Sequence, residues 1–150
     1  MSKNTLAFGI KGYFSGVLIK ADGSVETVFK HNLVVDSGLA YILSALFSAD
    51  RTSIMNYIAI GSGTVAPAAS NTALGAEISR IASSVTFSAN VATVTATFGA
   101  GVGTGAISEA GIFNAATNGI MLDRVVFSVK NKDADDVFTV TFEITVENKA

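Results

Sequence analysis

The sequence contains no cysteine and no tryptophan, and only one proline and one histidine among its 150 residues. Without cysteine there is no disulfide framework, no thiolate metal site and no cysteine nucleophile. This composition suits folding in a reducing cytosol. The single histidine, His31, lacks a second imidazole, so a triad or metal site would need Asp, Glu, Ser or Lys as companions. We therefore expect His31 to be structural or exposed, and we expect no enzymatic activity and no cofactor.

Charged residues make up only 15% of the chain, against about 25% in an average protein. The formal net charge is −2 and no run of Lys and Arg occurs, which argues against a nucleic-acid partner. A lone soluble monomer usually carries more charge, so we expect other subunits to cover much of the surface. We expect neither a secretory signal nor a membrane-spanning helix, because no long uncharged apolar stretch occurs.

Alternating apolar and polar residues predict most of the strands. From Phe138 to Val146 every second residue is large and apolar, and the residues between them are mostly threonine. A period of two is typical of a strand with one buried face. The pattern recurs at 92–98 and, more briefly, at 85–88, and we also expect strands at 107–113 and 120–129.

A hairpin is expected near the N-terminus, where strands around 13–20 and 25–29 flank Asp22-Gly23. Asp-Gly tolerates the positive φ that tight hairpin turns need. We predict one domain, 1–150, that is mainly β: an antiparallel β-sandwich or barrel-like sheet with one substantial α-helix.

The helix is predicted from a stripe of apolar residues at helical spacing: Leu39, Ile42, Leu43, Leu46 and Phe47. Asp36 or Ser37 can cap its first turn through a side-chain oxygen. We expect the stripe to lie across the sheet and to close one end of the core.

Two glycine-rich segments are expected to be flexible contact loops. They contain Gly61, Gly63 and the only proline, Pro67, and then glycine at every second position from 99 to 105, namely Gly99, Gly101, Gly103 and Gly105. Such segments have few side chains with which to pack. Neither predicts a nucleotide site, because the glycine spacing is wrong for a dinucleotide fingerprint and no Lys-Ser/Thr pair follows.

The segment from Asn131 to Asp136 places oxygen-bearing side chains at the first, third and fifth positions, as calcium loops do. However, Asp136 stands where such a loop has glycine, Phe142 stands where it has glutamate, and strands rather than helices flank it. We therefore interpret the segment as a solvated turn and keep weak divalent-ion binding as the alternative.

Several charged residues lie inside apolar segments rather than in loops: Glu77, Arg80, Glu109, Asp123 and Arg124. Charged groups that enter a core need partners, because an unpaired buried charge is very costly. We expect Glu109 and Arg124 to pair, with Glu77 or Arg80 as a third member. A paired-carboxylate enzyme would also use Glu77 and Glu109, but it would need a polar, aromatic-lined cleft. We therefore interpret Glu77, Arg80, Glu109 and Arg124 as a structural charge cluster.

The register of the hairpin that carries Glu109 and Arg124 depends on its turn. A six-residue connection, Asn114–Gly119, sets Glu109 opposite Arg124. A two-residue turn at Asn118-Gly119 instead sets Arg124 opposite Phe113. We favour the first register because it pairs the charges.

Four phrases stand out together: HNLVVDSGLAYIL (His31–Leu43), YIAIGSGTVAPAASNTALGAEISR (Tyr57–Arg80), SEAGIF (Ser108–Phe113) and MLDRVVF (Met121–Phe127). Their order resembles small structural proteins of tailed-bacteriophage particles, from the tail, the neck or collar, or the capsid-decoration sets. The resemblance covers most of the chain.

This resemblance implies a non-enzymatic virion protein, made in the host cytoplasm and added in multiple copies through contacts with itself and with other virion proteins. It implies no nucleic-acid, membrane or small-molecule partner. We favour a tail or neck/collar component over a capsid decoration protein. The alternative from another class is a receptor- or carbohydrate-binding module, which the absence of tryptophan disfavours.

Overall fold

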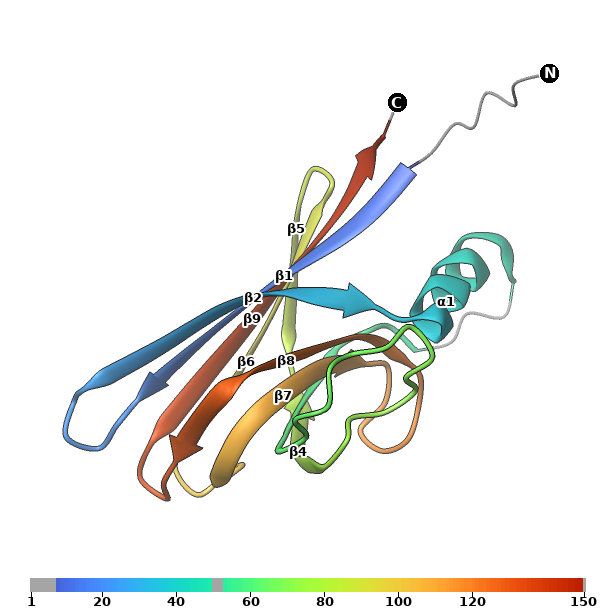
Figure 1. Ribbon diagram of the computed structural model, residues 1–150. Helices are drawn as coiled ribbons and strands as arrows, with labels where there is room; N and C mark the ends of the chain where they lie inside the picture. The colour runs from blue at the N-terminus through green and yellow to red at the C-terminus, as the bar shows by residue number, and fades with distance from the viewer. Residues whose placement is uncertain (1–7, 50–52, 150) are drawn as a thin grey trace.

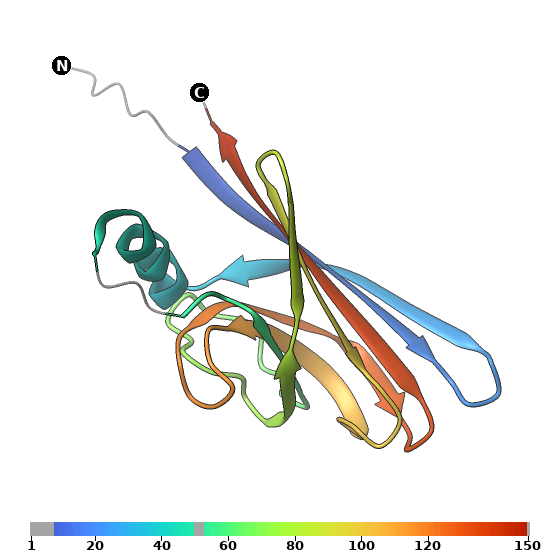
Figure 2. The same ribbon diagram turned by 180° about the vertical axis from the view of Figure 1, so that it is seen from behind.

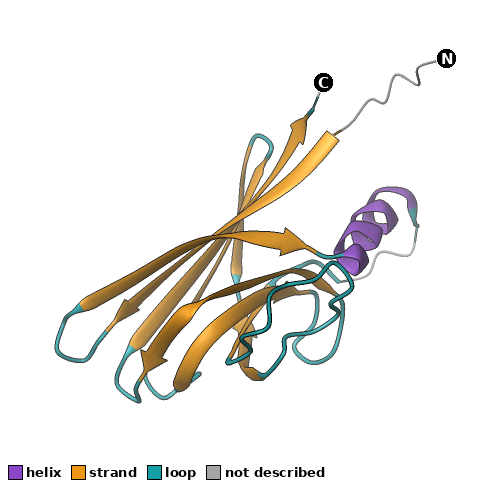
Figure 3. Ribbon diagram, in the orientation of Figure 1, coloured by secondary structure: helices purple, strands orange, loops and turns teal. Residues whose placement is uncertain are grey.

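The computed structural model describes residues 8–49 and 53–149 and confirms a mainly β chain with a nearly closed, barrel-like antiparallel sheet (Figures 1 and 3). The elements in chain order are β1 (Phe8–Ile19), β2 (Val25–Val34), α1 (Asp36–Phe47), β3 (Tyr57–Gly61), β4 (Glu77–Ala82), β5 (Ser84–Ser88), β6 (Val91–Phe98), β7 (Gly105–Phe113), β8 (Met121–Lys132) and β9 (Val137–Asn148). In the described ranges no helix has the length and apolar character that crossing a membrane requires.

The nine strands form one sheet in the order β4-β3-β7-β8-β2-β1-β9-β6-β5. The two edge strands, β4 and β5, follow each other in the chain and are separated only by Ser83. The sheet therefore curls until its edges lie close together. Figure 2 shows the β5–β6 hairpin crossing in front of the long β1 and β9 strands.

The residues with a period of two line the inside of the barrel, as predicted. Phe138, Val140 and Phe142 of β9 are fully buried, and the threonines between them face outward. The Phe14 ring of β1 stacks on Phe127 at 4.9 Å between centroids and also contacts Phe142 at 5.1 Å. Burying such rings provides most of the free energy that stabilises a β core.

Strand β2 joins the two halves of the sheet at a corner. Asn32 is paired with Gly12 of β1, whereas the next two residues pair with β8, as Leu33↔Arg124 and Val34↔Asp123. Directly after this corner, the Val35 amide donates to the Leu122 carbonyl at 3.0 Å, and α1 begins. The helix is therefore attached to β8 at its first turn.

The helix forms where it was predicted, but its apolar stripe does not close the core. Phe47 is 82% exposed and Leu46 is 69% exposed, and more than half of Leu43 is also exposed. Of the predicted stripe, Ile42 packs against the core. The predicted N-cap is also wrong: the helix begins at Asp36 with Val35 as the N-cap residue, and no side chain caps it.

The two ends of the barrel differ in chemistry. At one end, which we call the polar end, polar contacts join the turns β1–β2, β6–β7 and β8–β9. At the other end β1, β9 and the β5–β6 hairpin diverge beside α1 (Figure 1). The core is open there.

Candidate functional site

The predicted pair of Glu109 and Arg124 is present and buried. The Arg124 Nη2 and Nε atoms lie 2.8 and 3.0 Å from Glu109 Oε2. Neither side chain is more than 3% exposed. The third member is Asn71, whose Oδ1 accepts from Arg124 Nη1 at 3.0 Å. Neither Glu77 nor Arg80 takes that place, so this part of the prediction is wrong.

Backbone amides complete the shell around Glu109. Oε1 accepts from the N–H groups of Gly63 and Ala76 at 2.9 and 2.7 Å, and Oε2 accepts from Gly75 at 2.9 Å. Burial raises the pKa of Glu109, but the hydrogen bonds from Ala76, Gly75, Arg124 and Gly63 outweigh it and hold the pKa below its usual value. The carboxylate is therefore ionised, and it fixes the loop from Ser62 to Ala76 onto the sheet. We call this arrangement the Glu109 cluster.

Neither register considered for this hairpin is correct at the charged residues. Glu109 is opposite Val126 and Arg124 is opposite Gly111, so the ion pair runs diagonally across the two strands. The register shifts twice along the hairpin, between Ile107 and Glu109 and again between Ile112 and Phe113. A Cβ atom added at Gly111 would lie 2.8 Å from the Asp123 carbonyl oxygen, so glycine at that position allows the close approach of β7 and β8.

Gly61 and Gly63 are structural positions beside the carboxylate. Gly61 ends β3, and a Cβ atom added there would lie 2.4 Å from the Ala76 carbonyl oxygen. At Gly63 the added Cβ would lie 2.5 Å from Glu109 Oε1. Glycine is required because the backbone approaches the carboxylate closely. Pro67, in contrast, lies in the part of the loop between these contacts, and its role as a flexible contact position stays a prediction.

Glu77 and Arg80 form a separate pair at the edge of the sheet. Arg80 Nη2 lies 2.6 Å from Glu77 Oε1, and Arg80 Nη1 donates to the carbonyls of Ala115 and Asn118 at 2.9 and 2.7 Å. The guanidinium also lies 3.6 Å from the centre of the Phe113 ring. Arg80 thereby holds the β7–β8 connection against β4.

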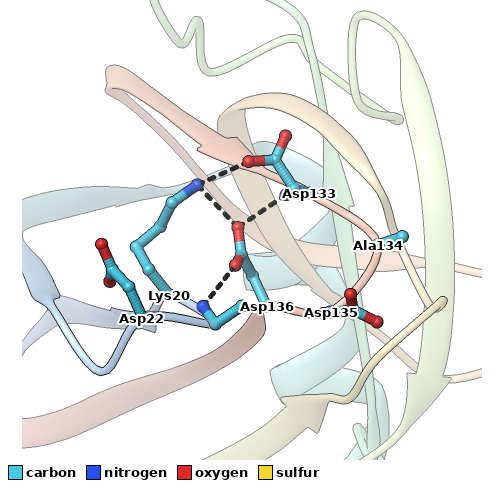
Figure 4. Close-up of a pocket in the computed structure, with 7 residues that line it drawn as sticks. Lys20, Asp22, Asp133, Ala134, Asp135 and Asp136 are labelled. Atoms are coloured by element: carbon cyan, nitrogen blue, oxygen red, sulfur yellow. Dashed lines mark hydrogen bonds and ion pairs between the residues drawn. The ribbon is translucent and has the colours of Figure 1, made fainter.

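The turn once compared with a calcium loop holds a lysine (Figure 4). Lys20 Nζ lies 2.6 Å from Asp136 Oδ2 and 2.9 Å from Asp133 Oδ2, and it also donates to the Asn131 carbonyl. Asp136 is buried and accepts further bonds from the Ala21 and Asp133 amides. No group of acidic or histidine residues suited to a metal ion occurs within ranges 8–49 and 53–149. The ammonium of Lys20 binds two carboxylates of this turn. The segment is a turn, as predicted, but it is not fully solvated, because Asp136 is buried.

The pKa values at this turn follow from the same contacts. The hydrogen bond from Lys20 lowers the pKa of Asp136 to about 2, and the bonds to Asp136 and Asp133 raise the pKa of Lys20 above its usual range. The contacts tie the β1–β2 hairpin to the β8–β9 hairpin at the polar end.

The second glycine-rich segment is anchored to the same end. Lys132, buried, donates from Nζ to the Gly99 carbonyl at 2.8 Å, and burial lowers its pKa. The Gly101 amide donates to the Ala134 carbonyl at 2.6 Å. Gly101, Gly103 and Gly105 all have positive φ, which explains why glycine recurs here.

We expect the amides of residues 99–105 to exchange rapidly in the isolated protein and to be protected in the assembled state, because the turn has few side chains that could shield it. The exceptions include Gly101 and Val102, whose amides already donate to the Ala134 and Gly99 carbonyls. Hydrogen exchange read out by mass spectrometry in both states measures this. Equal exchange in the two states would contradict a contact role for Gly99, Gly101, Gly103 and Gly105.

His31 is exposed, as expected. Its ring meets Tyr13 edge to face at 5.5 Å, and Tyr13 stacks on Phe29 at 6.3 Å. No nucleophile accompanies it in these contacts, so the geometry gives it no catalytic arrangement.

The feature that sequence reasoning missed is an apolar groove at the open end of the barrel, with a volume of about 440 Å³. It lies between α1 and the inner faces of β5, β6 and β9, and its lining includes Ile42, Met55, Phe87, Val94 and Ile144. Its lining contains no charged side chain. Phe87 belongs to the short alternating segment 85–88, and it is 79% exposed at the rim of the groove.

The helix α1, which lines the groove through Ile42, also carries the exposed Leu43, Leu46 and Phe47. Ile54 and Val146 at the rim of the groove are also exposed, so several large apolar side chains face solvent side by side. Contiguous apolar surface of this kind is typical of sites that contact another protein, a membrane or an apolar ligand. The low charge of the chain was the signal for such a surface, but it did not locate it.

No family model, curated protein or solved structure matches this chain.

Proposed function

We propose that this chain is a non-enzymatic structural component of a tailed-bacteriophage particle, of the tail or neck/collar rather than a capsid decoration protein. It is made in the host cytoplasm and enters the virion in multiple copies, through contacts with itself and with other virion proteins. The observation that carries this proposal is the apolar groove together with the exposed stripe of α1, because a chain with so few charges leaves this surface open.

The arrangement of the four resembling phrases supports the proposal. Tyr57–Arg80 supplies β3, β4 and the loop between them, Ser108–Phe113 lies in β7, and Met121–Phe127 lies in β8. These segments meet at the Glu109 cluster. His31–Leu43 then turns the corner from β2 and docks α1 on β8. The phrases thus form one continuous unit that holds the loop and presents the helix.

The charged groups also fit a structural role better than a catalytic one. Glu109, Asp136 and Arg80 each hold a loop or a turn through several hydrogen bonds. A catalytic acid or base needs access to a substrate, whereas Glu109 and Asp136 are buried and fully engaged. Large apolar side chains, in contrast, are exposed at the groove and on α1.

We expect the purified protein to form multimers, and the double variant Leu46→Glu/Phe47→Glu to be a folded monomer, because two carboxylates on α1 cannot be desolvated without partners. Light scattering coupled to size exclusion measures the mass, and circular dichroism verifies the fold. The double variant Ile19→Glu/Val25→Glu is the matched control, because it adds the same charges to an exposed apolar pair at the polar end.

Recovery of the protein from intact particles tests the virion role itself. Native mass spectrometry should give a fixed copy number in the particle, in multiples of five or six. A stable wild-type monomer that is never recovered with any particle would refute the proposal. If the protein assembles in solution but is not recovered from particles, the interaction surface would be supported and the virion role would be refuted.

A further inference from the structure

Asp123 is a buried carboxylate without a cation. It lies on the same face of β8 as Val125 and Phe127, whose side chains belong to the core, and it is 0% exposed. None of the ion pairs in the described part of the chain includes it. The Ile112 amide donates to Oδ1 at 3.2 Å, and Asn32 Nδ2 donates to Oδ2. A buried carboxyl with so little compensation favours its neutral form.

Asn32 is only half satisfied by this contact. Its Oδ1 is buried and has no hydrogen-bond partner. The amide lies over Gly12, where an added Cβ would be 1.9 Å from Oδ1, so glycine at that position makes room for Asn32. A buried acceptor without a partner is destabilising, because the hydrogen bonds that it made to water are not replaced.

The amide of Asn32 has two orientations, and the proton on Asp123 decides between them. In the structure Nδ2 is directed at Oδ2, which is the orientation that an ionised carboxylate requires. When Oδ2 has taken a proton from solvent, a half-turn of the amide places Oδ1 opposite the new O–H and lets it accept. In both orientations the other end of the amide faces Gly12. The pair is therefore a bistable element that a single proton shifts.

The location of this pair gives the proton a structural consequence. Asn32 is paired with β1 and is directly followed by the two residues that pair β2 with β8. Leu122, which is adjacent to Asp123, accepts a hydrogen bond from the Val35 amide through its carbonyl, and Gly38 packs against the Leu122 backbone. We infer that Asn32 and Asp123 form a one-proton latch at the β2–β8 corner, which is closed when Asp123 is neutral and weakened when it ionises, and which thereby controls how firmly α1 is attached.

None of the ion pairs in the described residues joins Asp123 to a charged group on a neighbouring element. Arg124 of β8 is turned to Glu109, and Lys11 of β1 pairs with Glu147 at 2.9 Å. Lys30 of β2 and Asp36 at the start of α1 are both exposed to solvent. Burial is the main cause that raises the pKa of Asp123, to about 7, and the hydrogen bonds from Ile112 and Asn32 oppose it.

The sign of the pH dependence follows from this raised pKa. Below the ordinary value of 3.8 the carboxyl is protonated in both states, and the latch contributes fully. As the pH rises from about 4 to about 7, the unfolded chain loses the proton while the folded chain keeps it. Stability therefore falls, and the unfolding equilibrium constant rises by up to tenfold per pH unit. Above about 7 both states are ionised and this loss levels off.

Carbon NMR of the Asp123 carboxyl in the wild-type protein is the direct test. We expect a titration midpoint near pH 7 and a shift of the Asn32 side-chain amide signals with the same midpoint. A carboxyl that titrates near 3.8, or Asn32 signals that do not change as Asp123 titrates, would overturn the latch. This measurement needs no variant that has to fold.

Urea unfolding of Asp123→Asn between pH 5 and 7.5 is the second test, because asparagine is a permanently neutral near-isostere. We expect its unfolding constant to lack the wild-type rise of up to tenfold per pH unit. Asp135→Asn, at an exposed position, and His31→Gln, which removes the only imidazole, are controls that should keep the wild-type slope. Equal slopes in wild type and Asp123→Asn would contradict the inference.

Discussion

Glu109→Gln is expected to lower the free energy of unfolding by about 3–5 kcal/mol, the range found when one partner of a buried ion pair is removed. The substitution leaves the Arg124 guanidinium buried without its counter-charge. It also turns an amide N–H₂ group towards backbone donors that now bond the carboxylate, those of Gly63, Gly75 and Ala76. Urea unfolding followed by circular dichroism gives the value.

A double-mutant cycle with Arg124→Met separates the pair from the loop anchor. The double variant should cost less than the sum of the two single variants, because no orphan charge remains. The same substitutions at a surface pair, Glu147→Gln and Lys11→Met, form the control cycle, and exposed pairs contribute about 1 kcal/mol or less. A coupling energy near zero between Glu109 and Arg124 would reject the ion pair.

Gly38→Ala is expected to destabilise the protein by about 1–3 kcal/mol, although alanine favours helices more than glycine does. A Cβ atom at this position would lie 2.3 Å from the Leu122 carbonyl oxygen, and backbone on both sides resists a shift. The first turn of α1 must therefore move away from β8. If α1 presents the interaction surface, the variant should also lose assembly while the barrel stays folded.

The matched control for stability is Gly99→Ala, because an added Cβ meets nothing within 4 Å at that position. Urea unfolding compares the stability of the two variants, and light scattering compares the assembly of Gly38→Ala with that of the wild type. A Gly38→Ala variant that is as stable as the control, and that assembles like the wild type, would mean that the contact between α1 and β8 does not position the helix.

The sequence was sufficient for the strands whose two faces differ. Phe138–Val146 alternates because one face of β9 lies against core rings while the other faces solvent, so its period reports its environment directly. The ion pair of Glu109 and Arg124 was also predictable, since a charge inside an apolar strand needs a partner. Its diagonal register was not, because the shifts in β8 arise from tertiary contacts that leave no periodic mark.

Two features were beyond sequence reasoning for physical reasons. The anchors of the loop from Ser62 to Ala76 are backbone N–H groups, which every residue except proline carries, so nothing distinguishes Gly63 or Ala76 as a donor. The stripe of α1 shows that the helix has an apolar face, but not whether the same chain or another one covers it. Phe47 satisfies the helical pattern and still faces solvent.

The position of β9 in the sheet sets a constraint on how the chain folds. β9 lies between β1 and β6, and its register with β1 runs from Phe8↔Asn148 to Ile19↔Val137. During synthesis, β1 and β6 therefore cannot pair with their common neighbour, β9, until it has left the ribosome after all the other strands. Pairings this distant in sequence form slowly, typically in milliseconds to seconds. Until then, the edges of β1 and β6 and the phenylalanines beneath them are open to aggregation, so rapid folding of the last strand, or a chaperone, decides the yield of native subunits.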